Sequence, residues 1–172
     1  MPKYSTTSAG LTKGTPTLPP HELDEIGKLL RSAKRLATRY YTITGRPLGI
    51  TGEVAEYEAV RLLRLERSPV RQPGHDAIRR RQGRVTRLQV KARCILDPSR
   101  PGQRIGQIKL DREWDSVLLV ILDRNLEPVE IHEAGRGAVT RALQRPGSKS
   151  RNKRGALALN QFKRIARCVW RS

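Results

Sequence analysis

The spacing of apolar and polar residues divides the chain into helical and extended segments. Apolar residues recur every three or four positions from Leu23 to Tyr40, which is the spacing of one face of an α-helix. This pattern predicts a helix over residues 21–41 with one buried stripe. A second helix is predicted from Thr51, as its N-cap, to about Glu66.

After the second helix the pattern changes and favours β-strands. A hairpin is predicted from a strand near residues 75–80, a tight turn at Gln82-Gly83 and a strand over residues 85–95. Apolar and polar residues alternate along the later strand, so one of its faces belongs to the core. The uninterrupted apolar run from Val117 to Leu122 is typical of a central buried strand. The remaining predicted elements are a short strand over 105–110, a strand over 128–133, and helices over 138–144 and 159–169.

These elements predict an α/β fold with a central mixed β-sheet flanked by helices. Residues 1–20 are low in hydrophobicity and end in Pro19-Pro20, so we expect a disordered basic tail. Residues 21–172 show no repeat and no boundary that would divide them. We therefore expect one domain, with an N-terminal helix and a basic helical segment at its C-terminal end.

The net charge of the chain indicates which class of molecule it binds. The chain has 172 residues, of which 35 are Lys or Arg and 16 are Asp or Glu, giving a net charge of +19. Residues 71–172 carry 24 basic and 9 acidic side chains, against 11 and 7 in residues 1–70. Such an excess favours a polyanion, because each Lys or Arg that meets a phosphate releases condensed counterions. The alternative is a GC-rich genome that raises the Arg content, with many charges merely solvating the surface.

Other features argue against a membrane-spanning or secreted protein. The longest apolar run has six residues, whereas a membrane-spanning helix needs about 20. The N-terminal residues lack the apolar run of a secretory signal. Cys94 and Cys168 are far apart in sequence and suggest two buried thiols rather than a disulfide framework. We therefore expect a cytoplasmic protein with no membrane partner.

Four polar residues form a candidate site. Glu56 lies on the apolar side of the second predicted helix, Asp76 begins the hairpin, and Gln89 and Lys91 share the polar face of its later strand. Two carboxylates and an amide oxygen beside a lysine would suit Mg²⁺ or Mn²⁺, which lowers the pKa of a bound water. Singly, Glu56 could instead pair with an arginine, and Asp76 could cap the turn before the hairpin.

The same residues resemble the PD-(D/E)XK nuclease superfamily, which has the restriction-endonuclease-like fold. The similarity comprises Glu56, the segment Pro73-Gly74-His75-Asp76, and Gln89-Val90-Lys91, within residues 51–122. The chain resembles small bacterial members of the superfamily that have a D-x(n)-QxK variant motif. In this motif Gln89 of the chain stands at the position where most members have an acidic residue. The resemblance implies a restriction-endonuclease-like core, with Glu56, Asp76 and Gln89 binding Mg²⁺ and Lys91 assisting hydrolysis of a phosphodiester.

The sequence therefore predicts a metal-dependent endonuclease; DNA is favoured over RNA as its substrate, and RNA stays open. One alternative is a noncatalytic nucleic-acid-binding module with a degenerate nuclease fold, as part of a larger complex; another is a structural protein held to RNA by charge. A homodimer is also open, because cutting both strands requires two sites. The residues expected to hold the nucleic acid are Arg79, Arg80, Arg81, Arg93, Lys149, Arg151, Lys153 and Arg154.

Overall fold

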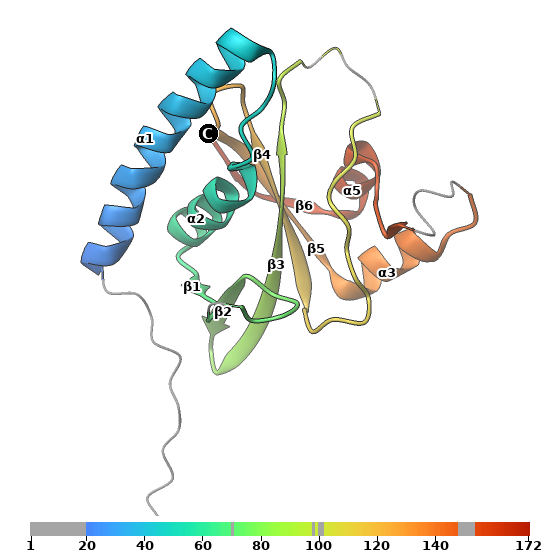
Figure 1. Cartoon of the computed structure of the whole chain (residues 1–172). Helices are drawn as coiled ribbons and strands as arrows, with labels where there is room; N and C mark the ends of the chain where they lie inside the picture. Colours follow the sequence, from blue (N-terminus) through green and yellow to red (C-terminus); the bar gives the residue numbers. More distant parts are fainter. Residues whose placement is uncertain (1–19, 70, 98, 100–101, 148–153) are drawn as a thin grey trace, which may run out of the picture.

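A computed structural model describes residues 20–69, 71–97, 99, 102–147 and 154–172. The described residues form a six-stranded mixed sheet with helices on both faces (Figure 1). This confirms the predicted α/β class and the central mixed sheet. The elements in chain order are α1 (Pro20–Thr44), α2 (Thr51–Leu63), β1 (Glu66–Arg67), β2 (Ala77–Arg81), β3 (Arg84–Cys94), β4 (Ser116–Leu122), β5 (Pro128–Gly135), α3 (Arg136–Gln144), α5 (Leu159–Ile165) and β6 (Arg167–Arg171).

The strands lie side by side in the order of the chain, β1 to β6. All neighbouring strands are antiparallel except β3 and β4, which are parallel from the pair Leu88 and Ser116 to the pair Cys94 and Leu122. Every residue of β4 is buried, as predicted for the central strand. The long connection between β3 and β4 lies on the α3 side of the sheet (Figure 1).

The sheet separates two hydrophobic cores. On the α2 side, Leu118, Val120 and Leu122 of β4 pack with residues of α1, α2 and β3. On the other side, Val117, Leu119 and Ile121 pack with residues of α3, α5 and the segment before β4. Full burial of each such side chain contributes roughly 1.5–3 kcal/mol. Coverage on both faces explains why β4 is apolar at consecutive positions rather than at alternate ones.

The predicted hairpin is confirmed as β2 and β3. Gln82 and Gly83 at its tip have φ angles of 49° and 75°, which is the type I′ geometry that suits the twist of a two-residue hairpin. Pairing of β2 with β3 ends at Ala77 and Leu88. Beyond Leu88, β3 continues to Cys94 paired with β4. This later half of β3 therefore has an edge that β2 does not cover.

The second helix ends earlier than predicted and does not use the predicted cap. Its N-cap is Ile50 rather than Thr51, and it ends at Leu63 rather than near Glu66. Arg64 has the left-handed conformation, with φ of 51°, and its N–H bonds back to the helix. The released chain, Glu66–Arg67, pairs with β2 as strand β1.

Two further elements differ from the prediction. Residues 105–110 form no regular strand; the N–H groups of Ile105 and Ile108 bond instead to the carbonyls of Leu157 and Gly155. The final helix stops at Ile165, and the chain then forms β6 along β5. The apolar residues at this end therefore serve both cores, because Ile165 packs on the α3 side and Val169 on the α2 side.

Three more predictions concern burial and the two ends of the chain. The helix over residues 21–41 is confirmed as α1, but only part of its apolar stripe is buried. Cys94 is half-buried and Cys168 is exposed, so the expectation of two buried thiols is wrong; both are free. No helix among the described residues is long and apolar enough to cross a membrane. The expected N-terminal tail, apart from Pro20, and residues 148–153 lie outside the described part.

Candidate active site

Asp76 lies immediately before β2, where the hairpin leaves the edge of β3. Its N–H donates to the carbonyl of Leu88 at 2.9 Å, and its Oδ2 accepts from the N–H of Val90 at 2.7 Å. The carboxylate therefore caps the open edge of β3 and not the preceding turn. Gly74 permits this course of the chain: its φ is +102°, and a Cβ there would lie only 2.7 Å from the carbonyl oxygen of Glu113.

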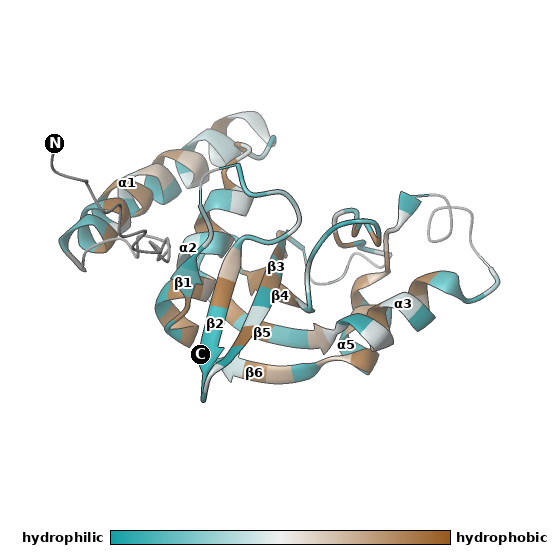
Figure 2. Cartoon of the chain, turned by 90° about the horizontal axis from the view of Figure 1, so that it is seen from below, coloured by the Kyte–Doolittle hydropathy of each residue, from teal (hydrophilic) through white to brown (hydrophobic). Residues whose placement is uncertain are grey.

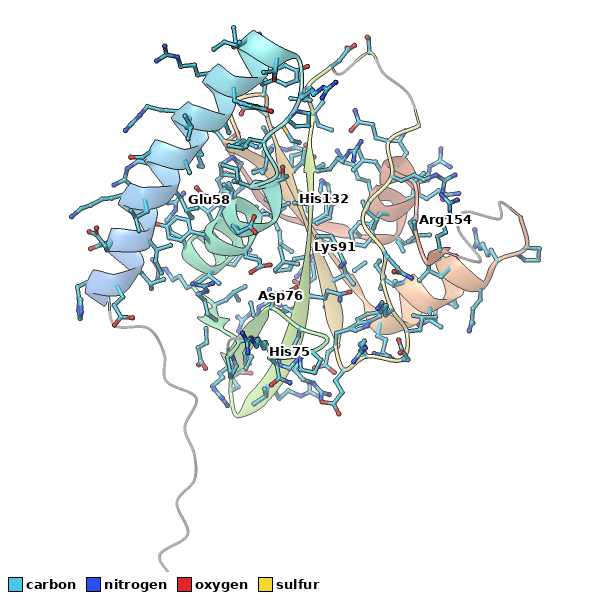
Figure 3. The ribbon with its side chains drawn as sticks, in the orientation of Figure 1. Glu58, His75, Asp76, Lys91, His132 and Arg154 are labelled. Carbon is cyan, nitrogen blue, oxygen red and sulfur yellow. The ribbon has the colours of Figure 1, made fainter. Side chains whose placement is uncertain are left out.

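Gln89 and Lys91 alternate with Leu88 and Val90 along β3, so they lie on the face opposite the α2-side core. Both side chains are half-buried. A Cβ at Gly106 would lie 3.7 Å from Cδ of Lys91, so the connection before β4 passes close to the lysine. Figure 3 shows Asp76 and Lys91 near the centre of the molecule along β3.

The carbonyl oxygen of the Gln89 side chain is buried and has no hydrogen-bond partner. Four such side-chain atoms occur among the described residues. The hydroxyl of Ser68 is another, and the N–H of Ser68 donates to the carbonyl of Asp76 at 3.0 Å. Because an unpartnered buried oxygen costs about 1–3 kcal/mol, the buried oxygen of Gln89 needs an explanation.

Glu56 comes to the same region from α2. Burial raises the pKa of its carboxyl group, and the charge of Asp76 raises it further. Lys91 and Arg67 act in the opposite direction. Among the described residues, Glu56 forms no ion pair within 4 Å. The structure thus brings Glu56 within electrostatic reach of Asp76, Arg67 and Lys91.

The surroundings of Lys91 act on its pKa in both directions, and the net effect is a lowered pKa. Burial lowers the pKa of its ammonium group, and the exposed Lys109 lowers it further. Asp76 and Glu56 oppose this effect. Desolvation penalises both the buried acid and the buried base here, which is a pattern found at functional sites.

Glu56, Asp76 and Gln89 offer the types of oxygen ligand that a divalent cation accepts. No three acidic, histidine or cysteine side chains in the described part of the chain are grouped so as to hold a metal ion. The third candidate oxygen ligand is an amide, that of Gln89, and it is the unpartnered atom. Carboxylate and amide oxygens are ligands that Mg²⁺ accepts, and Mg²⁺ in proteins usually keeps several waters and substrate phosphates as further ligands. Glu56, Asp76 and Gln89 are therefore chemically suited to Mg²⁺ or Mn²⁺.

The arginines of β2 have different environments. Arg79 pairs with Glu133 at 2.9 Å and is half-buried, and Arg80 pairs with Glu66 at 3.0 Å. Arg81, at the end of the strand, is exposed. Two of these three predicted nucleic-acid contacts are therefore already engaged in ion pairs, and Arg79 is the less accessible of them.

Of the other predicted phosphate contacts, the structure describes Arg93, in the later half of β3, and Arg154, before α5. Arg93 is exposed and donates to the side-chain oxygen of Gln103 at 3.1 Å. Arg154 is exposed next to α3 and α5 (Figure 3). Lys149, Arg151 and Lys153 lie outside the described residues.

Two cations that act on the site were not predicted from the sequence. Arg67, in the two-residue strand β1, lowers the pKa of Glu56, and Lys109, before β4, lowers that of Lys91. Lys109 stands in a segment that was predicted as a strand, and Arg67 follows the predicted helix end near Glu66, in a strand that was not predicted. An Arg after a helix end is not a specific signal.

Comparison with known proteins assigns neither a family nor an activity. No protein-family model matches the chain, and no curated protein sequence matches it significantly. A function must therefore be inferred from the residues and contacts of the chain itself.

Proposed function

We propose that the chain is a divalent-metal-dependent nuclease that hydrolyses phosphodiester bonds of DNA on a restriction-endonuclease-like core. The observation that best supports this function is the electrostatic proximity of Glu56 and Lys91 to Asp76, which caps the open edge of β3. The unpartnered oxygen of Gln89 lies on the same stretch of strand. The four residues also carry the resemblance to the nuclease superfamily.

Glu56, Asp76 and Gln89 would hold Mg²⁺ or Mn²⁺. When bound, the cation would lower the pKa of a water and polarise the phosphodiester. The protein residues supply a place where such a charge is favourable, because Glu56 and Asp76 repel each other when both are ionised. One carboxylate oxygen of Asp76 already accepts a hydrogen bond from the N–H of Val90, and this bond fixes the orientation of the Asp76 side chain.

Lys91 would stabilise the negative charge that develops on the phosphate as water attacks. Its half-buried position strengthens this interaction, because charges interact more strongly where water is excluded. The hydrogen bond between Asp76 and Val90 and the pairing of β3 with β4 hold the lysine backbone in place. Lys109 is exposed close to Lys91 and would contact a neighbouring phosphate.

The decisive experiment measures cleavage by purified protein. Linear, nicked, branched and single-stranded DNA, and RNA of the same sequences, are incubated with Mg²⁺, with Mn²⁺ or with EDTA. We expect cleavage of DNA that EDTA abolishes. Asp76→Asn and Lys91→Met should each reduce the rate at least about a hundredfold, because each removes charge used in the transition state.

Matched controls separate chemistry from charge loss. Asp111→Asn and Lys28→Met make the same chemical changes at exposed positions and should leave the cleavage rate unchanged. The Asp76 and Lys91 variants should bind DNA as the parent chain does, and they should unfold cooperatively within about 5 °C of its melting temperature. Cleavage that persists in EDTA, or that survives Lys91→Met, would contradict the proposal.

The competing function is noncatalytic nucleic-acid binding. Gln89 favours it, because a neutral amide binds a divalent cation less tightly than a carboxylate does. The net charge of +19 supports binding in either case. This function predicts no cleavage of any substrate, together with DNA affinity that falls steeply with salt and does not depend on Mg²⁺.

A further inference from the structure

Helix α1 has an apolar stripe on its outer side. Leu29 and Leu36 are each 62% exposed, Tyr40 is 41% exposed and Ile43 is 73% exposed. These four are most of the exposed large hydrophobic side chains in the described part of the chain. Figure 2 shows apolar positions recurring along α1 at the outside of the molecule.

The stripe is not needed to attach α1 to the rest of the fold. The inner side of the helix does this through buried Ala37, through the ion pair of Lys34 with Glu58, and through close packing of Gly27 on Tyr57. A Cβ on Gly27 would lie 2.3 Å from the Tyr57 hydroxyl oxygen, so the two helices approach closely there. At 3.6 residues per turn, the exposed stripe lies roughly 120° around the helix from this inner side.

The stripe has the spacing of a seam between helices. Leu29, Leu36 and Ile43 are separated by seven residues each, which places them in one line when two helices supercoil. The line extends over roughly 21 Å of helix. Ser32 and Ala33, between the two leucines, are small enough to let another helix approach.

Charges on the same stripe indicate which helix fits. Glu25 continues the stripe towards the N-terminus, and Arg39 borders it near the other end. In an antiparallel pair of α1 helices, Leu29 faces Leu36 of the second copy, and Glu25 then lies beside Arg39 of that copy. A parallel pair would place like charges together instead.

We propose that α1 is the interface of a homodimer, in which it pairs antiparallel with α1 of a second copy around a two-fold axis near Ser32 and Ala33. α1 has five basic and three acidic residues, so repulsion between the copies is weaker there than at the C-terminal half. α1 also lies on the opposite side of the sheet from α3 and α5 (Figure 1), which leaves the basic C-terminal surface free. The dimer does not depend on the proposed nuclease function.

Sedimentation equilibrium of the full chain tests the association. We expect a mass of twice the 19.4 kDa of one chain. Leu29→Ser and Leu36→Ser should each weaken the dimer about tenfold, Ile43→Ser at the margin of the pair should weaken it less, and the three together should give a monomer. Val85→Ser is the matched control, because Val85 is apolar, 50% exposed and on β3, and it should have no effect. A monomer at concentrations up to about 100 µM, or a dimer unaffected by the triple substitution, would overturn the proposal.

Charge exchange and cross-linking test the orientation. Glu25→Arg and Arg39→Glu should each weaken association, and the chain with both changes should recover it. In a background with Cys168→Ser, which removes an exposed thiol, Ser32→Cys should form a disulfide-linked dimer under mild oxidation. Leu29→Cys alone should not form one, but should cross-link to Leu36→Cys. Efficient cross-linking of Leu29→Cys to itself would show a parallel pair and overturn the antiparallel one.

Discussion

The molecule contains two clusters of buried or half-buried charge that are built in opposite ways. In the first, Nζ of Lys34 lies 2.8 Å from a carboxylate oxygen of Glu58, and both side chains are only 5–6% exposed. Glu127 and Arg61 complete it, at 3.0 Å from the lysine and 2.7 Å from Glu58 respectively. Each buried charge therefore has two partners. Figure 3 shows Glu58 on α2, on the side of α1.

In the second cluster the groups are near one another but are not paired. Burial raises the pKa of Glu56 and lowers that of Lys91, which means that folding disfavours both charges. The oxygen of Gln89 has no partner. A buried pair with full hydrogen bonding holds elements together, whereas unpaired polar groups are retained where a ligand completes them. This difference favours a structural role for the first cluster and a binding role for the second.

The largest expected effect is the loss of the first cluster. Glu58→Ala leaves Lys34 buried with only the exposed carboxylate of Glu127, and should lower the free energy of unfolding by about 3–5 kcal/mol. Urea denaturation followed by circular dichroism measures this. Glu53→Ala, which removes an exposed carboxylate of the same helix, should cost less than about 1 kcal/mol. Equal losses in the two variants would show that Glu58 is no more structural than a surface residue.

Sequence patterns were sufficient to predict the elements whose structure depends on residues that are close together in the chain. The hairpin was predictable because a two-residue Gln82-Gly83 turn allows its tight geometry. Strand β4 was predictable because a buried central strand needs apolar residues on both faces. The boundary between α5 and β6 was missed, since Ile165 and Val169 have helical spacing while packing on opposite faces of the sheet.

The features that the sequence did not predict depend on contacts between residues that are far apart in the chain. Lys34 and Glu58 are 24 residues apart, and no local pattern distinguishes Glu58 from Glu56 as the carboxylate that α1 covers. The candidate site was predictable as far as Asp76 and Lys91, because β-strand alternation and hairpin pairing place them together. Arg67 was not, since its position depends on α2 ending early.

An intermediate effect is expected from adding metal, which should complete the second cluster. At a Mg²⁺ or Mn²⁺ concentration ten times the dissociation constant, binding stabilises the fold by about 1.4 kcal/mol, or roughly 3 °C in melting temperature. Differential scanning fluorimetry of the protein with and without metal measures the shift. Asp76→Asn should abolish it, and Gln89→Glu should reach it at lower metal concentration.

The first cluster supplies the control for the metal experiment. Glu127→Gln removes an exposed carboxylate from the Lys34 cluster and should leave the metal-dependent shift unchanged. A shift of the same size in Asp76→Asn as in the parent chain would show that the cation binds elsewhere, and the second cluster would then have no binding role.

The smallest effects should appear in the pH dependence of stability without metal. Removing the charge of Glu56 or of Lys91 should stabilise the fold at pH 7, and the gain should disappear at low pH for Glu56 and at high pH for Lys91. Because the folded state raises the pKa of Glu56 above 4.5, the ionised carboxylate destabilises the fold above that pH and not below it. Glu56→Gln in EDTA should therefore raise the melting temperature at pH 7 by on the order of 2 °C, and this gain should disappear as the pH falls below 4.5. For Lys91 the folded state lowers the pKa below 10.5, so the gain from Lys91→Met should be present at pH 7 and disappear as the pH rises through 10.5. Stabilities that decrease in both variants at pH 7 would mean that these charges are already satisfied, as in the Lys34 cluster, and the contrast between the two clusters would fail.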